Sequence, residues 1–320
     1  MKRIGFYQPH LDIQGTGVSY FDYAFYNEKI LNNKSIMFYD AQHPATHPLA
    51  KEKFEKAIET IPLPGTENMN ALKQACKDYE IDALYIQKCG RPNDGRFIDT
   101  VPTFIHVVGV CNEPHGTVYA YVSKWLSQHC SNETLPYVSY IIRLPETDKN
   151  FRDTLNIPSD AVVFGRTGGP YSWNIPFVND VIKKVLEQNK NYYFIFANTQ
   201  PFITHERVKF VEPFADLLIK RRFINTCNAM IHARQEGESF GAAIGEFSLC
   251  NKPVITYRLS PEKSHLQILG DKGIYYEDAQ SLEKAINNIQ TQLHGDYNAY
   301  KNFTPEKVMY HFNKVFISKI

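Results

Sequence analysis

The stretch that decides the fold class of this chain is HARQEGESFGAAIGEFSLCNKPVI, at residues 232–255. It continues an apolar run, passes through an acidic loop that contains glycine, and enters a helical pattern near Phe240 or Gly241. Asn251 and Pro253 end that pattern, and the apolar residues behind them begin a new strand. The order strand, helix, strand is the βαβ unit of a parallel sheet, so the sequence predicts an α/β protein.

Two carboxylates lie on either side of the start of this helix. Glu238 comes just before the helix, and Glu246, eight residues later, lies about one and a half turns inside it. One carboxylate can therefore meet a group in front of the helix, while the other reaches along its flank. The N–H groups at the helix start favour an anion such as phosphate. The plainer alternative is that these acids only cap the helix.

The same alternation of strands and helices extends to both sides of the stretch. Apolar runs predict strands at 3–7, 35–39, 83–87, 103–108 and 120–122, and then at 162–166, 193–197, 229–233 and 253–257. Helical patterns predict helices at 18–31, 69–79 and 123–130, and then at 177–188, 214–225 and 241–250. A last helix is well marked, because Thr304 is a good N-cap and Pro305 suits the first helical position.

Residues 144–160 separate the two halves of the chain. This segment is polar, contains two prolines and interrupts the apolar rhythm, which is typical of a connection between domains. We therefore expect an N-terminal Rossmann-like acceptor domain over residues 1–145 and a C-terminal Rossmann-like domain over 160–300. A C-terminal helix within 301–320 is expected to pack back towards the N-terminal domain.

Composition and charge exclude several classes of protein. The 320 residues are 43% hydrophobic and 22% charged, and 35 basic against 34 acidic side chains leave a net charge of +1. This balance gives no overall attraction to nucleic acid or to an anionic membrane, so neither is expected as a partner. The six cysteines contain no C-x-x-C pair, which argues against a zinc site or a disulfide framework and for a reducing compartment. With no apolar leader and no bilayer-spanning run, we expect a cytoplasmic protein.

Three weaker signals add candidate site residues. Gly15 and Gly17 lie in the loop after the first predicted strand, where glycine lets the backbone approach a ligand. Arg166 ends the first strand of the second half, in the sequence FGRTGG, and its charged fork suits phosphate oxygens. His106 follows an apolar run near a strand end. Each also has a plain structural interpretation, namely a glycine turn, a solvated arginine and a core histidine.

Several common catalytic motifs are absent from the sequence. There is no H-E-x-x-H, no P-loop and no D-x-D for a metal-bound nucleotide sugar. A dinucleotide fingerprint is incomplete, because Tyr20 stands where its third glycine belongs, although Asp40 lies where a ribose-binding acid is expected. An NAD(P)-dependent Rossmann-fold oxidoreductase is therefore an alternative.

The segment from Glu238 to Glu246, followed by CNKPVI, resembles the motif of two glutamates in retaining GT-B glycosyltransferases, most like glycosyltransferase family 4. The loop with Gly15 and Gly17, the FGRTGG segment and the VSKW segment at 122–125 are similar to the same families. The resemblance spans nearly the whole chain. It implies the GT-B fold, in which two Rossmann-like domains hold the active site in the cleft between them.

The resemblance also implies a role for each candidate residue. Glu238 would contact hydroxyls of the donor sugar, and Glu246 the ribose of the nucleotide. Backbone N–H groups at the helix start, together with Arg166, would hold the diphosphate. The implied donor-binding residues are Gly15, Gly17, Arg166, Glu238, Ser239, Phe240, Gly241 and Glu246, and the implied catalytic residues are Glu238, His106 and Arg166.

The implied activity is a retaining transfer of a hexosyl or pentosyl group from a nucleotide-diphosphate sugar to a glycan or another hydroxyl acceptor. It implies no metal and no cofactor, since N–H dipoles and Arg166 meet the charge that grows on the leaving diphosphate. The family usually carries a lysine shortly after this arginine, where Tyr171 stands here, and Arg234 and Arg221 are the candidate substitutes. An inactive GT-B protein that only binds sugar nucleotides is the other alternative.

Overall fold

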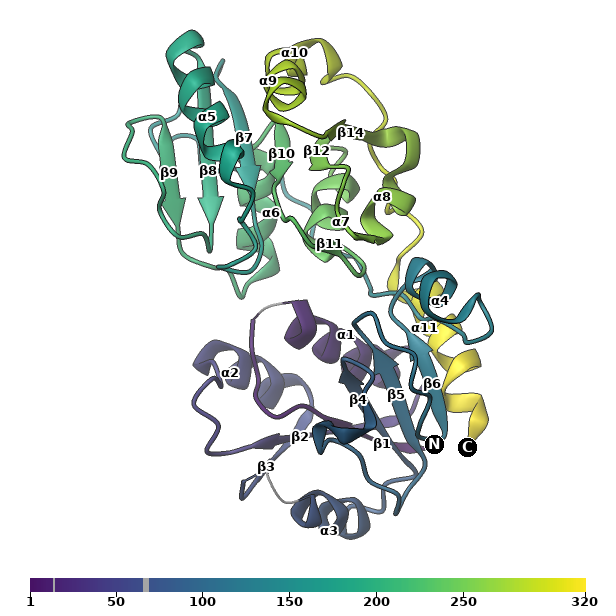
Figure 1. The fold of residues 1–320 in the computed structure, drawn as a ribbon. Coiled ribbons are helices and arrows are strands. Elements are labelled where there is room, and N and C mark those ends of the chain that lie inside the picture. The colour runs from purple at the N-terminus through teal and green to yellow at the C-terminus, as the bar shows by residue number, and fades with distance from the viewer. Residues whose placement is uncertain (14, 66–68) are drawn as a thin grey trace. The chain divides into compact units, whose positions relative to one another are not determined.

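The computed structural model describes residues 1–13, 15–65 and 69–320, which form two α/β units. Unit 1 consists of Met1–Ile141 and Phe303–Ile320, and unit 2 of Ile142–Asn302. Each unit is built on its own six-stranded sheet, with helices packed against it (Figure 1). The predicted fold class, α/β with two Rossmann-like domains, is confirmed.

In unit 1 the strand order is β3-β2-β1-β4-β5-β6, and all neighbours run parallel. The chain builds the sheet first on one side of β1 and then, from β4 on, on the other, and ligands bind at the carboxyl ends of strands in sheets of this type. The strands are β1 (Arg3–Tyr7), β2 (Lys34–Asp40), β3 (Glu59–Leu63), β4 (Ala83–Lys88), β5 (Thr103–Val107) and β6 (Val118–Tyr121). The helices are α1 (Gly15–Lys29), α2 (Pro48–Ala57), α3 (Asn70–Asp78), α4 (Lys124–Ser131) and α11 (Pro305–Val315).

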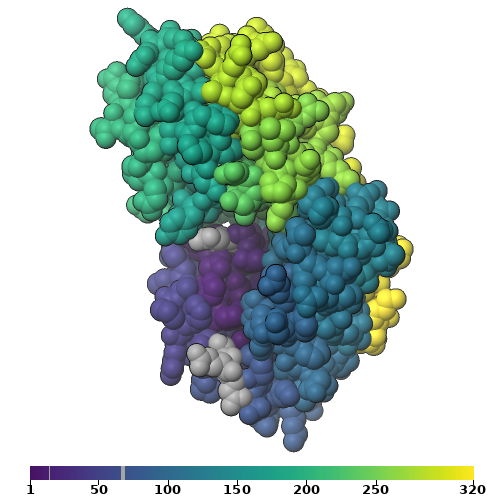
Figure 2. Space-filling model, in the orientation of Figure 1, coloured from purple at the N-terminus to yellow at the C-terminus, as the bar shows by residue number. Residues whose placement is uncertain are grey.

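Helix α11 comes from the far end of the chain and completes the core of unit 1. Thr304 caps it by accepting a hydrogen bond from the Lys307 N–H, as expected from the sequence. The Phe312 ring stacks on Tyr23 of α1 at 5.1 Å, and Phe316 lies 5.4 Å from Phe104 of β5. In the space-filling view the yellow C-terminal end lies beside the blue segments of unit 1 (Figure 2).

Unit 2 repeats this arrangement with the order β14-β12-β10-β7-β8-β9, and again all neighbours run parallel. The strands are β7 (Val162–Arg166), β8 (Tyr192–Ala197), β9 (Val208–Val211), β10 (Ala229–His232), β12 (Val254–Tyr257) and β14 (Gly273–Tyr276), with β11 (Gly237–Glu238) and β13 (Glu262–Lys263) in a separate short ladder. The helices are α5 (Pro176–Gln188), α6 (Leu217–Thr226), α7 (Ala242–Leu249), α8 (Ser264–Leu269), α9 (Ala279–Asn287) and α10 (Ile289–Gln292).

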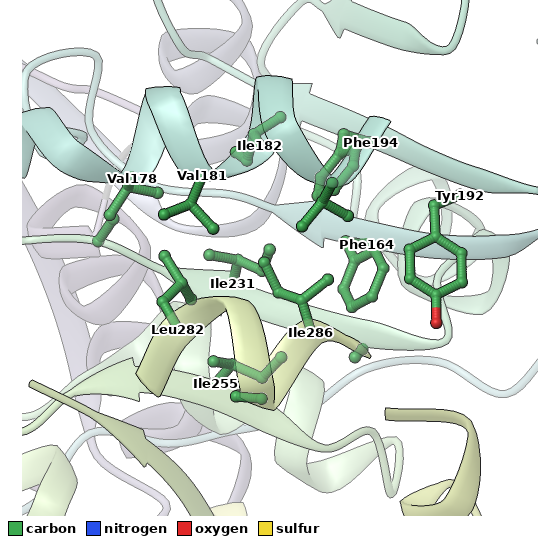
Figure 3. Packing of buried hydrophobic residues seen from close by; sticks show 14 of the residues in the cluster. Phe164, Val178, Val181, Ile182, Tyr192, Phe194, Ile231, Ile255, Leu282 and Ile286 are labelled. Carbon is green, nitrogen blue, oxygen red and sulfur yellow. The ribbon is translucent and has the colours of Figure 1, made fainter. Parts of the chain in front are cut away.

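The core of unit 2 lies between its sheet and the helices α5 and α9 (Figure 3). Helix α5 contributes Val178 and Ile182, which are fully buried, and the neighbouring helix α9 contributes Ile286. They meet strand residues such as Phe164 and Ile231. Burial of apolar area on this scale is the main force that holds a sheet and its helices together.

The polar segment at 144–160 belongs to unit 2 in the structure. The Phe151 N–H donates to Thr226 Oγ1 at 2.9 Å, and the Arg152 guanidinium donates to the carbonyls of Pro158 and Ala161, both at 2.9 Å. These contacts attach the segment to unit 2, although its composition is that of a connection.

Most elements lie where the sequence patterns predicted them, and β1 and β7 have the predicted bounds. The structure adds five strands that the sequence patterns did not predict: β3, β9 and β14 in the two main sheets, and the short β11 and β13. It also adds the helices α2, α8, α9 and α10. The expectation of five strands in the first half is therefore wrong, because the sheet of unit 1 has six strands, including β3.

Candidate functional site

The loop between β10 and α7 carries the predicted site of unit 2. Its residues Gly237 and Glu238 form β11, which pairs in parallel with β13, and the Glu262 N–H donates to the Glu236 carbonyl at 2.9 Å. This ladder fixes the backbone of Glu238 just in front of the helix. The helix begins at Ala242, close to the predicted start.

The Glu238 carboxylate is held by two side chains from its own chain segment. His232 Nε2 lies 3.1 Å from its Oε1, and Arg234 Nη1 donates to its Oε2 at 3.1 Å. Thr256 Oγ1 lies 2.9 Å from the other ring nitrogen of His232. Burial by itself raises the pKa of Glu238, but the hydrogen bond from His232 and the charges of His232 and Arg234 prevail and hold that pKa at about 2. Glu238 is therefore ionised, and it acts only as a hydrogen-bond acceptor.

The N-terminus of α7 lies next to this carboxylate. Its N-cap is Gly241, which has φ +90° and no side chain that could cap the helix. A Cβ on Gly241 would lie 3.0 Å from His265 Cβ and 3.5 Å from Glu238 Cβ, so only glycine fits this conformation and this space. Tyr300 Oη supports the turn by donating to the Phe240 carbonyl at 3.0 Å. The first N–H groups of α7 are therefore left for a ligand or for water.

His265 lies beneath this turn and was not predicted from the sequence. It is fully buried, its ring lies 5.2 Å from that of His232, and among the described residues neither ring nitrogen has a partner with ordinary hydrogen-bond geometry. Burial, with a smaller contribution from His232, lowers the pKa of His265 to about 3. A neutral ring therefore packs against the start of α7.

Glu246 lies on the flank of α7, as the spacing predicted. Lys220 of α6 donates to its Oε1 at 2.7 Å, and the two side chains are 14% (Lys220) and 9% (Glu246) exposed. One oxygen of the Glu246 carboxylate thus has a cationic partner, while both side chains remain partly exposed to solvent. The lysine was not predicted, because nothing in the sequence of α6 marks it as a neighbour of Glu246.

Arg166 lies at the carboxyl end of β7, beside β10 in the sheet, and its guanidinium joins two loops. One nitrogen donates to the carbonyl of Asn198 at 3.0 Å and to Thr199 Oγ1. The other donates to the Gly169 carbonyl and to Ser172 Oγ, both at 2.7 Å. Burial lowers the pKa of Arg166 to about 10, which leaves it charged at neutral pH. Its contact with a phosphate stays a prediction.

The other cations considered for the diphosphate have partners of their own. Arg234 pairs with Glu238 and lies 3.7 Å from Glu236. The Arg221 Nε donates to Asn225 at 3.0 Å. Tyr171, at the position of the family's lysine, is 83% exposed.

The remaining predicted residues belong to unit 1. Gly15 and Gly17 form the first turn of α1, and a Cβ on Gly17 would lie 2.2 Å from the Asp12 carbonyl oxygen. His106 is fully buried in β5, where Tyr85 Oη lies 2.5 Å from one ring nitrogen and the Val138 carbonyl 2.8 Å from the other. These are the contacts of a core side chain, and a part in catalysis stays a prediction.

Within residues 1–13, 15–65 and 69–320, no group of three or more His, Cys, Asp or Glu side chains is placed to hold a metal ion. In the same ranges, none of the helices combines the length and the apolar character needed to cross a bilayer.

At the level of sequence, no protein-family model and no curated protein matches the chain. Solved structures do resemble it. One is Anabaena HepE in complex with UDP-glucose, with a TM-score of 0.73 and 15% identity, over 99% of this chain and 100% of HepE. Another is a glycosyltransferase from Rickettsia africae, with a TM-score of 0.68 and 15% identity, over 98% of this chain and 94% of that one. The chain has the GT-B fold.

The GT-B fold does not by itself define a reaction. A putative UDP-N-acetylglucosamine 2-epimerase from Listeria monocytogenes also resembles the chain, with a TM-score of 0.63 and 10% identity, over 98% of this chain and 95% of that one. At such identities the likeness concerns the fold alone, and function has to be argued from the site.

Proposed function

We propose that this protein is a nucleotide-sugar glycosyltransferase that retains the anomeric configuration of the donor and needs no metal. The observation that carries the proposal is an ionised, half-buried carboxylate, Glu238, beside the N-terminus of a helix whose N-cap is a glycine, with Glu246 further along the same helix. A sugar diphosphate offers hydroxyls for the carboxylate and negative charge for the helix start.

The proposed donor contacts follow from these groups. Glu238 accepts hydrogen bonds from sugar hydroxyls, and the first N–H groups of α7 donate to the diphosphate. Glu246 accepts from the ribose hydroxyls, and Lys220 holds one oxygen of this carboxylate by a hydrogen bond. In the transfer, the C–O bond to the diphosphate breaks while the acceptor oxygen bonds to the same carbon. The acceptor's proton passes to a diphosphate oxygen, and the helix N-terminus stabilises the charge that develops there.

The comparisons support the choice of the first donor to test. HepE is described in complex with UDP-glucose, and the Listeria protein as a putative epimerase of a UDP-sugar. We therefore expect a UDP-sugar to be among the donors. The resemblance of the Glu238–Glu246 segment to retaining enzymes favours transfer over epimerisation.

The test combines binding with product analysis. We expect UDP-glucose or another nucleotide sugar to raise the thermal unfolding temperature, and mass spectrometry to find a glycosylated product with a pool of hydroxyl acceptors. Glu246→Gln should lose the stabilisation. Glu236→Gln is the matched control, because Glu236 is an exposed glutamate in the loop that precedes α7. If NAD(H) alone stabilised the protein, it would be an oxidoreductase. If the sugar of the donor changed without an acceptor, the protein would be an epimerase. If a nucleotide sugar bound but no product formed, it would be an inactive GT-B protein.

A further inference from the structure

The terminal N–H groups of Arg166 are all occupied within unit 2. An arginine carries five N–H groups, two on each terminal nitrogen and one on Nε, and it binds a phosphate in a fork with two neighbouring ones. One terminal nitrogen donates to the Asn198 carbonyl at 3.0 Å and to Thr199 Oγ1. The other donates to the Gly169 carbonyl and to Ser172 Oγ, both at 2.7 Å. A fork on a phosphate would have to break at least one of these bonds.

The acceptors of Arg166 belong to two loops at the carboxyl edge of the sheet. Gly169 and Ser172 follow β7, and Asn198 and Thr199 follow β8, which pairs with β7. Both hydroxyls accept from the guanidinium, and each donates in turn to a carbonyl of its own segment. Arg166 is 2% exposed, so the guanidinium joins the two loops from the inside.

The loop after β7 is shaped around this guanidinium. A Cβ on Gly168 would lie 2.7 Å from Arg166 Nη2 and 3.2 Å from Ser172 Oγ, so a side chain there would displace the guanidinium. The Gly168 carbonyl accepts from the Asn198 side-chain amide at 2.9 Å. Because a trans peptide places its C=O and N–H on opposite sides, the Gly169 N–H points away from Asn198. Among the described residues no acceptor faces that N–H, which leaves it for a ligand or for water.

These loops lie next to the candidate donor site of unit 2. Strand β7 pairs with β10, and the segment after β10 carries Glu238. Burial is the main cause that lowers the pKa of Arg166, while the charge of Glu238 raises it and that of Arg234 lowers it further. The guanidinium is therefore within electrostatic reach of the carboxylate proposed to meet the donor sugar.

We propose that Arg166 is a positioning residue, which holds the loops after β7 and β8 in place for the donor diphosphate and does not itself bind the diphosphate. The proposal rests on the proposed function, because the donor is part of it. It differs from the phosphate contact that the sequence predicted for Arg166. The two roles make opposite predictions for variants that change only the acceptors of the guanidinium.

The test is calorimetry with UDP and GDP, of which the tighter ligand of the wild type is used for all variants. Ser172→Ala and Thr199→Val, combined in one chain, remove one acceptor from each terminal nitrogen and keep the arginine. We expect this double variant to raise the dissociation constant about tenfold. Arg166→Lys should have a similar effect, since lysine keeps the charge but cannot span both loops. In the triple variant the two effects should not add, because both break one network.

The matched control keeps both hydroxyls. Ser172→Thr combined with Thr199→Ser changes the same two positions and should bind the ligand like the wild type. Recovery of binding with these conservative replacements assigns the loss to the hydrogen bonds of the guanidinium, and not to any change at the two positions.

Trp173 reports on the loops without any ligand. It follows Ser172, and its ring stacks at 5.8 Å on Phe202, which belongs to the loop after β8. The chain has two tryptophans, so Trp125→Phe leaves Trp173 as the one fluorophore of this kind. In that background we expect its emission to shift to longer wavelength in the double variant, because the loops separate and water reaches the ring.

A direct phosphate contact would give another pattern. If the double variant binds like the wild type while Arg166→Lys loses affinity, or if the two effects add in the triple variant, the proposal is overturned. If the wild type binds neither UDP nor GDP, the proposed function fails. In that case a shifted Trp173 emission still shows that Arg166 holds the two loops, and an unchanged emission refutes that role as well.

Discussion

At Glu238, the neighbouring side chains keep the carboxylate charged, although burial favours its neutral form. The carboxylate would tend towards the neutral form in a low-dielectric site, but His232 and Arg234 face its two oxygens. Since this carboxylate only accepts, His232 donates from Nε2, and the Thr256 hydroxyl lies 2.9 Å from its Nδ1. A chain of three side chains thus orients the group that is proposed to recognise the donor sugar.

Thr256→Val tests this chain, because it removes the hydroxyl and nearly keeps the shape. We expect the affinity for UDP-glucose to fall about fivefold, the equivalent of about 1 kcal/mol for one hydrogen bond, while the affinity for UDP is unchanged. Calorimetry with both ligands measures the difference. Thr226→Val removes another buried hydroxyl in unit 2 and should leave both affinities alone. An equal loss for UDP and UDP-glucose in Thr256→Val would contradict the assignment to the sugar.

Glu246→Gln should weaken the binding of the nucleotide part of the donor. The amide keeps the size of the side chain but loses the charge, so a ribose hydroxyl meets a weaker acceptor and Lys220 loses its partner. We expect UDP to bind about tenfold more weakly, the equivalent of about 1.4 kcal/mol. Glu236→Gln, measured in the same way, should bind UDP like the wild type. Unchanged UDP binding in Glu246→Gln would show that Glu246 does not bind the nucleotide.

His106 predicts how the stability of unit 1 depends on pH. Burial lowers its pKa to about 4, against about 6.5 in an unfolded chain. Between these values the unfolded chain binds a proton that the folded one does not, so acidification destabilises the fold. From pH 7 to pH 5, His106 should cost about 2 kcal/mol of the free energy of unfolding. Urea unfolding of the wild type and of His106→Gln at both pH values measures this contribution. The variant should lose about 2 kcal/mol less stability than the wild type between pH 7 and pH 5. An equal pH dependence in the two proteins would refute the argument.

At the scale of elements, sequence patterns found the buried parts of both sheets. The strands β1, β4, β7 and β10 are continuous apolar runs because helices cover both of their faces. The strands β3 and β9 lie at sheet edges, where Pro62 and Lys209 are tolerated and the apolar pattern is broken. These two strands form because each pairs with a neighbouring strand. A local sequence pattern carries no information about that pairing.

The same distinction holds for the candidate site. The positions of Glu238 and Glu246 relative to α7 followed from their spacing along one segment. Thr256, His265 and Lys220 come from β12, α8 and α6, and only the fold brings them to that segment. The sequence therefore predicted which acids flank the helix, but not the groups from other elements that surround them.

Helix α1 offers a matched pair of substitutions in its first turn. A Cβ on Gly17 would clash with the Asp12 backbone, whereas nothing lies within 4 Å of a Cβ on Gly15. We expect Gly17→Ala to lower the free energy of unfolding by about 2 kcal/mol or more, and Gly15→Ala to change it by less than about 0.5 kcal/mol. Denaturant titration measures both. Equal stability of the two variants would show that the first turn shifts to accept a side chain.

For the whole molecule, the proposed chemistry predicts the outcome of one reaction. With the donor and acceptor found in the screen, transfer should continue in excess EDTA, because N–H groups and cationic side chains balance the diphosphate. The new linkage should keep the donor's anomeric configuration. One NMR time course reports both. Loss of activity that Mg²⁺ or Mn²⁺ restores would refute the metal-free proposal, and an inverted anomeric proton would refute retention.

The return of α11 to unit 1 has a consequence for biosynthesis. Unit 2 is continuous in the chain, whereas unit 1 takes Phe303–Ile320 from the end. On the ribosome, the sheet of unit 1 emerges first but must wait for Phe312 and Phe316 to close its aromatic core. Unit 2 can be complete before that moment. A released chain that ends at Asn302 should therefore present a protease-resistant unit 2 and a protease-sensitive unit 1, although unit 1 is translated earlier.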